Sequence, residues 1–376
     1  MNRADNGANP QQTQALLGRG LRAHQAGQLA DAESLYRQTL DLEPNHAEAN
    51  HLLGVIAHQT GDHDAAVELI GKAITANPDA PAYHCNLGNA FYELGRMQDA
   101  EASQRRAIAL NPNYAMALGN LGNVLLALGK TDEAVDNYQK ALALNPDNAD
   151  AHANLGTAWK KQGRLEDAKA SYSQALALNP GHAEAHTSLG NVFQDQGELK
   201  AAVECHRQAL TLNPGFAEAH SNMGNALKDM GLMEAATASY QKAISLNPDL
   251  AGAHTNLGLV LQERNLLEDA IASHQHAIAL DPDYAEAHTN LGNALKNLGR
   301  LEDAAKSHRR ALALKPDFAE AHNNLGGVLC DLMDLEGALE HYKRAFTLKP
   351  DYSSARGNYL HTLLYQPELS NEALFD

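Results

Sequence analysis

The sequence predicts an all-α solenoid built from helix–turn–helix units of 34 residues. Three landmarks support this prediction, because each of them recurs at the same interval without an insertion. Prolines that separate the units are Pro10, Pro44, Pro78, Pro112, Pro146, Pro180, Pro214, Pro248, Pro282, Pro316 and Pro350. Ten residues after all but the last proline come the unit glycines Gly20, Gly54, Gly88, Gly122, Gly156, Gly190, Gly224, Gly258, Gly292 and Gly326. Twelve residues after each unit glycine come Ala32, Ala66, Ala100, Ala134, Ala168, Ala202, Ala236, Ala270, Ala304 and Ala338.

This interval divides the chain into four parts. Residues 1–12 show no periodicity, and we expect them to be disordered. Residues 13–352 hold ten units of 34 residues, and residues 353–366 are expected to form one more helix that caps the array. Pro367 should end that helix, and Ser370 can cap a new one, so residues 367–376 are expected to begin a linker to a further C-terminal domain.

Within a unit, two short amphipathic helices meet at a turn glycine, which supplies the left-handed backbone that ends the first helix. The turn glycines are Gly27, Gly61, Gly95, Gly129, Gly163, Gly197, Gly231 and Gly299. Asn265 replaces this glycine once and tolerates the conformation, whereas Met333 does not adopt it cheaply. We therefore expect a different turn at Met333. An acidic pair such as Glu302 and Asp303 then opens the second helix, and the next proline ends it.

Two local contacts follow from these spacings. A unit glycine opposite its alanine, such as Gly292 opposite Ala304, is expected to let the two helices of a unit cross with their backbones almost touching. Asp283 with Glu286, and likewise Asp317 with Glu320, have the spacing of a capping box at the start of a first helix.

These landmarks resemble the tetratricopeptide repeat, a 34-residue helix–turn–helix with Leu-Gly in its first helix, Ala in its second and Pro at the junction. The resemblance covers residues 13–352. It implies a right-handed superhelix whose concave groove is lined by the first helices. It says little about function beyond the binding of other proteins.

One stripe of each first helix is polar and is expected to face this groove. In the unit 285–316, Leu291, Gly292 and Leu295 should point into the stack with Ala287 and Ala294. The polar stripe of the same helix holds Thr289, Asn290, Asn293, Lys296 and Asn297.

One position of this stripe, the row asparagine, is nearly constant along the chain. The row comprises Asn86, Asn120, Asn154, Asn222, Asn256, Asn290, Asn324 and Asn358, with Ser188 as its single break. Second-position asparagines, one helical turn further on, are Asn89, Asn123, Asn191, Asn225 and Asn293. Lys160, Lys228 and Lys296 add cations at intervals.

Asparagine is a poor residue for a helix interior, so its recurrence indicates a role. A carboxamide can both donate to and accept from one extended peptide unit, and first helices about 10 Å apart would meet a peptide at about every third residue. The alternative is that the asparagines link adjacent first helices or simply tolerate solvent at a consensus position. The sequence leaves both interpretations open.

Other polar rows have plainer explanations. Glu48, Asp150, Glu184, Glu218, Glu286 and Glu320 either face the groove or cap helices. The histidine row His84, His152, His186, His220, His254, His288 and His322 is expected to pack flat rings at the seams between units. His182 and His186 have i, i+4 spacing but no third ligand signature, so we predict no metal site. No nucleophile–base arrangement or phosphate loop occurs, and we expect a chain that is not itself an enzyme and takes no cofactor.

The composition of the chain limits the classes of partner and the compartment that we expect. With 29 Lys+Arg against 46 Asp+Glu, the net charge of −17 disfavours nucleic acid and anionic membranes. Three cysteines without paired spacing are typical of a reducing compartment. The polar N-terminus and the lack of a long apolar run predict neither a signal peptide nor a membrane span. We therefore expect a cytoplasmic protein.

The segment Tyr359–Asp376, YLHTLLYQPELSNEALFD, resembles the junction in bacterial members of the protein O-GlcNAc transferase family, where a repeat array runs into the catalytic region through a Tyr-x-Pro-x-Leu-Ser segment. The row asparagines resemble the asparagine ladder with which that family holds substrate peptides. The resemblance implies a substrate-recognition arm for transfer of N-acetylglucosamine from UDP-GlcNAc to Ser or Thr, with the catalytic region beyond Asp376.

The alternative is a free-standing adaptor or assembly scaffold. Either way, the expected partners are extended peptides or flexible protein segments, and formation of a homodimer is left open.

Overall fold

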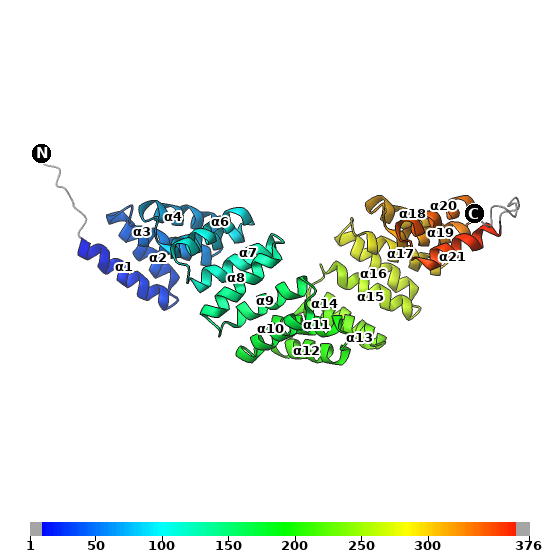
Figure 1. Ribbon diagram of the computed structural model, residues 1–376, viewed down its shortest axis with the longest axis horizontal. Coiled ribbons are helices and arrows are strands. Elements are labelled where there is room, and N and C mark those ends of the chain that lie inside the picture. Colours follow the sequence, from blue (N-terminus) through cyan, green and yellow to red (C-terminus); the bar gives the residue numbers. More distant parts are fainter. Residues whose placement is uncertain (1–9, 366–376) are drawn as a thin grey trace. The chain divides into compact units, whose positions relative to one another are not determined.

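A computed structural model describes residues 10–365, which form 21 α-helices and no strand (Figure 1). The predicted all-α solenoid is thus confirmed. The helices are α1 (Pro10–Gln25), α2 (Leu29–Leu42), α3 (Ala47–Gln59), α4 (His63–Ala76), α5 (Pro81–Glu93), α6 (Met97–Leu110), α7 (Ala115–Ala127), α8 (Thr131–Leu144), α9 (Ala149–Lys161), α10 (Leu165–Leu178), α11 (Ala183–Asp195), α12 (Leu199–Leu212), α13 (Ala217–Asp229), α14 (Met233–Leu246), α15 (Ala251–Glu263), α16 (Leu267–Leu280), α17 (Ala285–Asn297), α18 (Leu301–Leu314), α19 (Ala319–Asp331), α20 (Leu335–Leu348) and α21 (Ser353–Leu363).

The helices pack in chain order. Odd-numbered helices from α1 to α19 are the first helices of the units, and they pack against the even-numbered helices that follow them, as α3 does on α4 and α17 on α18. First helices of neighbouring units also touch, as α5 does α7 and α15 does α17. The chain falls into two compact units of tertiary structure, Met1–Ser188 and Leu189–Asp376. In each of them small and aliphatic side chains fill most of the interior, and alanines of the second helices such as Ala66 and Ala304 are completely buried.

The helix boundaries follow the prolines and the turn glycines. Second helices end two residues before the junction proline, as α18 ends at Leu314 ahead of Pro316. The N-terminal boundary was wrong, because α1 already begins at Pro10, inside the segment expected to be disordered. Proline suits the first helical position, since that position needs no backbone donor. The segment expected to begin a linker, residues 367–376, lies outside the described residues.

The turn at Met333 does not differ from the others, contrary to the prediction. All eight turn glycines have φ between 71° and 86°, and Asn265 and Met333 follow them with φ of 60° and 64°. The same backbone hydrogen bond also closes the turn, from the Asp334 N–H to the Leu329 carbonyl oxygen at 2.9 Å. The side chain of Met333 is 78% exposed, so nothing packed around it resists the left-handed backbone. The array therefore imposes its turn even where the residue disfavours it.

The unit glycines make room for a side chain of the second helix rather than for close contact between the two helix backbones. A Cβ atom added to Gly224 would lie 2.7 Å from Cε1 of Tyr240, and one added to Gly292 would lie 2.6 Å from Cε1 of His308. In each unit the obstructing side chain stands sixteen residues after the glycine, at what we call the glycine-facing position. This buried position holds Tyr36, Ile70, Gln104, Tyr138, Tyr172, His206, Tyr240, His274, His308 and Tyr342. The expected backbone contact with alanine is secondary to this one, and a backbone atom is among the closest only at Gly54 and Gly326.

Candidate functional site

The polar stripe of the first helices lies mostly as expected. In α17, Leu291, Gly292 and Leu295 are buried, whereas Asn290 and Asn293 are half-buried. Thr289 does not belong to the stripe. It is 4% exposed, and its hydroxyl donates to the Ala285 carbonyl oxygen at 3.1 Å. A short hydroxyl can satisfy itself within its own helix and so can be buried.

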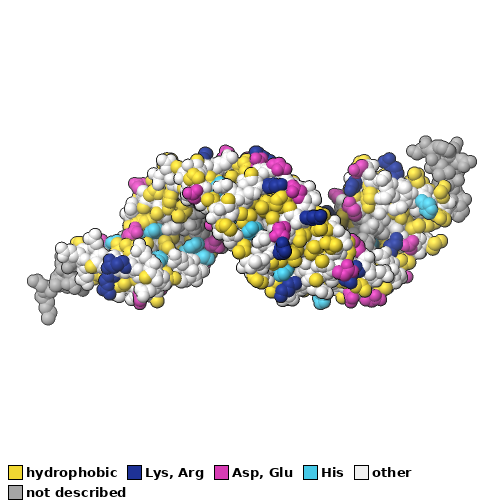
Figure 2. Space-filling model, turned by 90° about the horizontal axis from the view of Figure 1, so that it is seen from below, with side chains coloured by type: hydrophobic (Ala, Val, Ile, Leu, Met, Phe, Trp, Pro, Cys, Tyr) yellow, Lys and Arg dark blue, Asp and Glu magenta, His cyan; other side chains and the backbone are white. Residues whose placement is uncertain are grey.

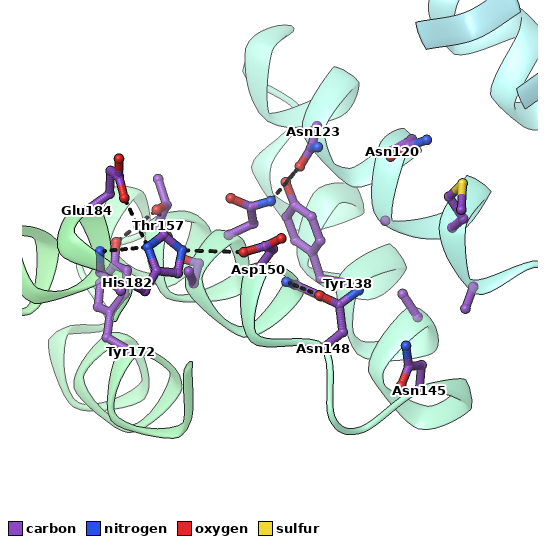
Figure 3. Close-up of a pocket in the computed structure, with 18 of the residues that line it drawn as sticks. Asn120, Asn123, Tyr138, Asn145, Asn148, Asp150, Thr157, Tyr172, His182 and Glu184 are labelled. Carbon is purple, nitrogen blue, oxygen red and sulfur yellow. Dashed lines mark hydrogen bonds and ion pairs between the residues drawn. The ribbon is translucent and has the colours of Figure 1, made fainter. Parts of the chain in front are cut away.

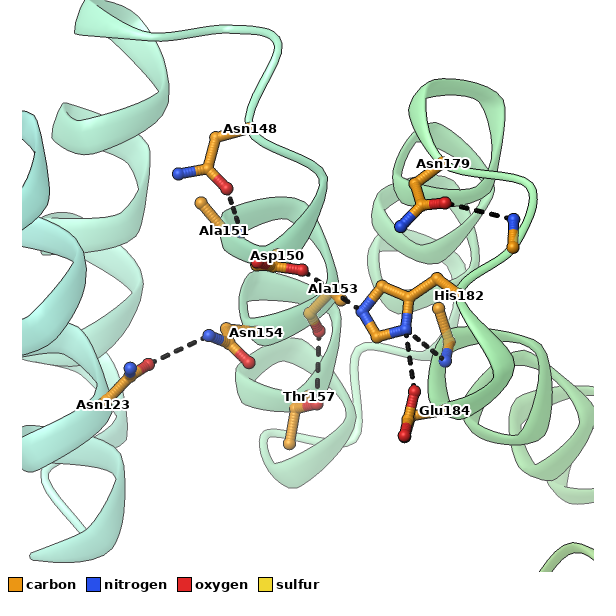
Figure 4. A network of polar contacts seen from close by, with 12 residues as sticks. Asn123, Asn148, Asp150, Ala151, Ala153, Asn154, Thr157, Asn179, His182 and Glu184 are labelled. Atoms are coloured by element: carbon orange, nitrogen blue, oxygen red, sulfur yellow. Dashed lines mark hydrogen bonds and ion pairs between the residues drawn. The ribbon is translucent and has the colours of Figure 1, made fainter. Parts of the chain in front are cut away.

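Five of the row asparagines use their side-chain amide to link neighbouring first helices. The Nδ2 of Asn120 donates to Oδ1 of Asn89 at 2.8 Å. Asn154 donates in the same way to Asn123 at 3.0 Å (Figure 4), and Asn256 to Asn225 at 2.9 Å. At the two ends of the row the partner differs, with Asn86 paired to His51 Nε2 at 2.8 Å and Asn358 to Asn323 Oδ1 at 3.1 Å.

The other three row asparagines make no such link among the residues that the structure describes. They are Asn222, Asn290 and Asn324, and the last only accepts a long bond from Nδ2 of its neighbour Asn323 at 3.4 Å. The linking interpretation therefore accounts for part of the row. In the linked residues it occupies one N–H of the amide and leaves Oδ1 without a bond inside the described chain. In Asn120 alone the Nδ2 group also donates a weak bond to Cys85 Sγ at 3.6 Å.

Two lysines of the stripe are paired with carboxylates. Lys296 lies 3.1 Å from Asp331 of the next first helix, and Lys228 lies 3.7 Å from Asp229. The charges of these two cations are therefore balanced by neighbouring carboxylates. On the face drawn in Figure 2, basic and acidic side chains lie interspersed rather than gathered by sign.

The capping-box prediction was wrong. The N-cap of α17 is Tyr284, so Asp283 stands one residue too early to cap, and its carboxylate pairs with Arg310 at 3.2 Å. Glu286 pairs with Lys315 at 3.0 Å, and the hydrogen bond from that lysine lowers the pKa of Glu286. The next unit repeats both pairs, Asp317 with Arg344 and Glu320 with Lys349. In these two units the i, i+3 spacing thus comes from two ion pairs.

A hollow of about 670 Å³ opens along this stripe in the unit Met1–Ser188 (Figure 3). Asn120, Asn123 and Asn154 of the asparagine rows line it, together with the hydroxyl-bearing Tyr138. At its other end His182 lies between two carboxylates, 3.1 Å from Glu184 and 3.5 Å from Asp150 (Figure 4). The break in the row falls here as well, because Ser188 is part of the lining.

A second hollow, of about 770 Å³, lies within the unit Leu189–Asp376. It is lined by Asn293, Asn324 and Asn358 of the asparagine rows, and by the ion pair of Lys296 with Asp331. In both units of tertiary structure, therefore, the polar stripe of successive first helices borders an open hollow.

Comparison with known proteins identifies the repeat. Residues 148–359, more than half of the chain, match the family model described as the Cilia and flagella-associated protein 70 C-terminal domain. Tetratricopeptide repeat models match residues 23–90, 81–114, 104–136 and 122–163. The chain belongs to the tetratricopeptide repeat family. Through residues 148–359 it belongs to the family of that C-terminal domain as well. It is a protein-binding repeat domain of the solenoid type.

Solved tetratricopeptide structures resemble parts of the chain. A crystal structure of MamA is 27% identical, with a TM-score of 0.40, and covers 44% of this chain and 96% of its own. The crystal structure of YrrB, described as a TPR protein with an unusual peptide-binding site, is 28% identical, with a TM-score of 0.42, and covers 50% of this chain and 96% of its own. No curated protein matches the chain.

The histidine row of this tetratricopeptide array acts at the junctions between units. Nε2 of His84 lies 2.8 Å from the Pro78 carbonyl oxygen, and six further histidines repeat the contact six residues after a proline. A carbonyl oxygen only accepts, so Nε2 carries the hydrogen. Asn50 and Arg356 occupy the same position and donate to the carbonyl oxygens of Pro44 and Pro350. The histidine row therefore satisfies the carbonyl groups of seven junction prolines, whereas Leu118 occupies this position after Pro112.

Residues 10–365 contain no group of three His, Cys, Asp or Glu side chains that could hold a metal ion. None of their helices is long and apolar enough to cross a membrane.

Proposed function

We propose that the tetratricopeptide groove holds extended peptides or flexible protein segments through their backbones. The observation that carries the proposal is the row of asparagines on successive first helices. In five of its members one amide N–H is tied to a neighbour, while Oδ1 is left without a partner inside the described chain. An amide held in this way can accept from a peptide N–H and donate its second hydrogen to a peptide carbonyl.

This arrangement favours an occupant of unspecified sequence. The contacts address peptide groups, which all sequences share, and the lysines that could select acidic side chains are paired with Asp229 and Asp331. A carboxamide also carries no net charge, so it does not repel either acidic or basic segments. Several modest hydrogen bonds in series would provide the affinity.

The experiment is the replacement of Asn222, Asn256, Asn290 and Asn324 by Ala. Fluorescence anisotropy measures the binding of fluorescein-labelled unstructured peptides. Peptides of about 15 residues are long enough to pass the row asparagines of about five units. We expect affinity to fall at least about tenfold, since several contacts of about 1 kcal/mol are lost together. Helicity should be unchanged. Unchanged affinity with a lower melting temperature would overturn the proposal and assign the row to packing.

We further propose that the array is the substrate-recognition arm of a protein O-GlcNAc transferase. The support is the resemblance of Tyr359–Asp376 and of the asparagine row to that family. In this role the array would present acceptor proteins, and UDP-GlcNAc would bind a catalytic region outside residues 1–376. The gene's reading frame after Asp376 tests the proposal, because a stop codon there leaves the free-standing adaptor as the function.

A further inference from the structure

The linked and unlinked row asparagines differ in the glycine-facing residue of the unit that precedes them. The three unlinked residues, Asn222, Asn290 and Asn324, each follow a unit whose glycine-facing residue is histidine. Those histidines are His206, His274 and His308. Where the link joins two asparagines of the groove rows, the glycine-facing residue of the preceding unit is instead tyrosine or glutamine, as in Tyr138, Tyr240 and Gln104.

At these linked positions the glycine-facing residue donates a hydrogen bond from the core to the second-position asparagine. The Tyr240 hydroxyl donates to Oδ1 of Asn225 at 2.7 Å, and Asn256 donates to the same oxygen at 2.9 Å. Tyr138 does so for Asn123 at 2.7 Å (Figure 3). Gln104 does so through Nε2 for Asn89 at 2.8 Å. Burial raises the pKa of Tyr138 and Tyr240, so both hydroxyls keep their proton.

Two donors on one oxygen determine how the amide is turned. An amide oxygen has two lone pairs, and here the buried donor takes one and the row asparagine takes the other. If the second-position amide flipped, its NH2 group would face the NH2 group of the row asparagine, and the bond between the two asparagines would be lost. A tyrosine hydroxyl would then have to turn and accept from that NH2 group, whereas Gln104 could not do so, because its Nε2 also donates to the Cys85 carbonyl oxygen at 3.0 Å. A buried tyrosine has few rotamers, so it holds this orientation at little further entropic cost.

Histidine does not provide this donor. Both ring nitrogens of His206 and of His308 are buried without a hydrogen-bond partner within residues 10–365, although Asn191 and Asn293 occupy the second position above them. The ring of His274 bonds instead to Gln262 at 3.2 Å, and the second position of that unit holds Leu259. The imidazole lacks the outward hydroxyl with which tyrosine reaches the second-position asparagine.

We propose that the glycine-facing residues are positioning residues for the groove. Tyrosine or glutamine there fixes the second-position asparagine, which in turn fixes the row asparagine of the next unit. Histidine leaves the row asparagine free to rotate. This inference deepens the proposed function, on which its consequence for peptide binding rests. It divides the row into fixed contacts, at Asn120, Asn154 and Asn256, and adjustable ones, at Asn222, Asn290 and Asn324.

The first test removes one hydroxyl. Tyr240→Phe should loosen the side-chain amides of Asn225 and Asn256, measured without peptide as exchange of their NH2 protons by NMR. We expect exchange about fivefold faster, the factor that corresponds to one net hydrogen bond. Tyr172→Phe is the matched control, because the Tyr172 hydroxyl bonds to Thr157 at 2.8 Å and no asparagine stands there. Equal exchange at Asn256 in the wild type and in Tyr240→Phe would overturn the proposal.

The second test installs the missing donor. His308→Tyr should slow the exchange of the Asn293 and Asn324 amide protons by about the same factor, because the new hydroxyl faces Asn293. His274→Tyr adds the same atoms in the next unit toward the N-terminus, but Leu259 offers no oxygen there, so Asn290 should not change. If both variants slowed their row asparagine alike, the effect would be one of core packing and the proposal would fail.

Peptide binding, measured on the same proteins, separates this inference from the function it rests on. Tyr240→Phe should weaken binding of the labelled peptides by about two- to fivefold through the added cost of ordering a free side chain. Tyr172→Phe should leave it unchanged. If the wild type binds none of the peptides while the amide exchange responds as stated, the proposed function fails and the positioning stands. If the wild type binds and neither measurement responds, the positioning fails and the function stands.

Discussion

Met333 shows how a single side chain yields to the array around it. Its φ of 64° lies in the left-handed region, which costs a residue with a Cβ atom about 1–2 kcal/mol. Eight other turns of the described chain place glycine there. The exposed side chain gains no packing in return.

Met333→Gly should therefore stabilise the protein. Relief of the backbone cost is partly offset by the greater freedom of glycine in the unfolded chain, which leaves a net gain of about 0.5–1 kcal/mol. Urea unfolding followed by circular dichroism measures it. Met333→Ala serves as the control, because alanine keeps the unfavourable conformation. A gain of similar size for Ala would show that the methionine side chain, and not its backbone, limits stability.

At the scale of the helix pair, the unit glycines and the glycine-facing side chains form one packing device. A Cβ atom at Gly122 would approach Cε1 of Tyr138 to 2.5 Å. Gly71, also inside a helix, has no heavy atom within 4 Å of such a Cβ atom. The same substitution should therefore have opposite signs at the two positions.

Gly122→Ala should destabilise the array by about 1 kcal/mol, since overpacking of about 1–3 kcal/mol exceeds the gain in helix propensity. Gly71→Ala should stabilise it by up to about 1 kcal/mol. Thermal unfolding of both variants in one buffer checks the prediction. Stabilisation by both substitutions would mean that the pair of helices adjusts freely around the methyl group added at Gly122, and destabilisation by both would mean that Gly71 is confined as well.

Helices and turns could be predicted from the sequence because proline, glycine and alanine act within a few residues of where they stand. The capping-box prediction was wrong because the contacts there are not local. Asp283 and Glu286 form ion pairs with Arg310 and Lys315, which are distant from them in the sequence. The hydrogen bond from the glycine-facing residue to the second-position asparagine was also not predicted from the sequence. Its signal is the recurrence of Asn123 with Tyr138 and of Asn225 with Tyr240, fifteen residues apart. That spacing acquires meaning only when the two helices are folded together.

At the scale of the whole molecule, the buried histidines are unevenly distributed. His206, His274 and His308 all belong to the unit Leu189–Asp376, whereas the glycine-facing positions of Met1–Ser188 hold Tyr, Ile or Gln. Burial lowers the pKa of each of the three imidazoles to about 4, and nearby Lys296 contributes at His308. Their ordinary pKa, about 6.5, returns on unfolding.

Between about pH 6.5 and pH 4 the unfolded chain therefore binds more protons than the folded one, so these histidines make stability fall as the pH is lowered. Their full contribution is on the order of 3 kcal/mol each. We expect α12, α16 and α18 to lose hydrogen-exchange protection between pH 7 and pH 5, as followed by mass spectrometry. The triple variant His206→Tyr, His274→Tyr, His308→Tyr should retain protection at pH 5. An equal loss in that variant would assign the acid sensitivity to other groups, such as His51 or His341.

The absence of insertions between the units has a consequence for any long chain held in the groove. If all units carried identical groove residues, a segment bound through its backbone could shift by one unit without a change in binding free energy. Ser188 removes this translational degeneracy in Met1–Ser188, and the mixture of fixed and adjustable asparagines removes it in Leu189–Asp376. Under the proposed function, the small departures from the repeat select one alignment among many, and they would slow diffusion of the bound chain along its track.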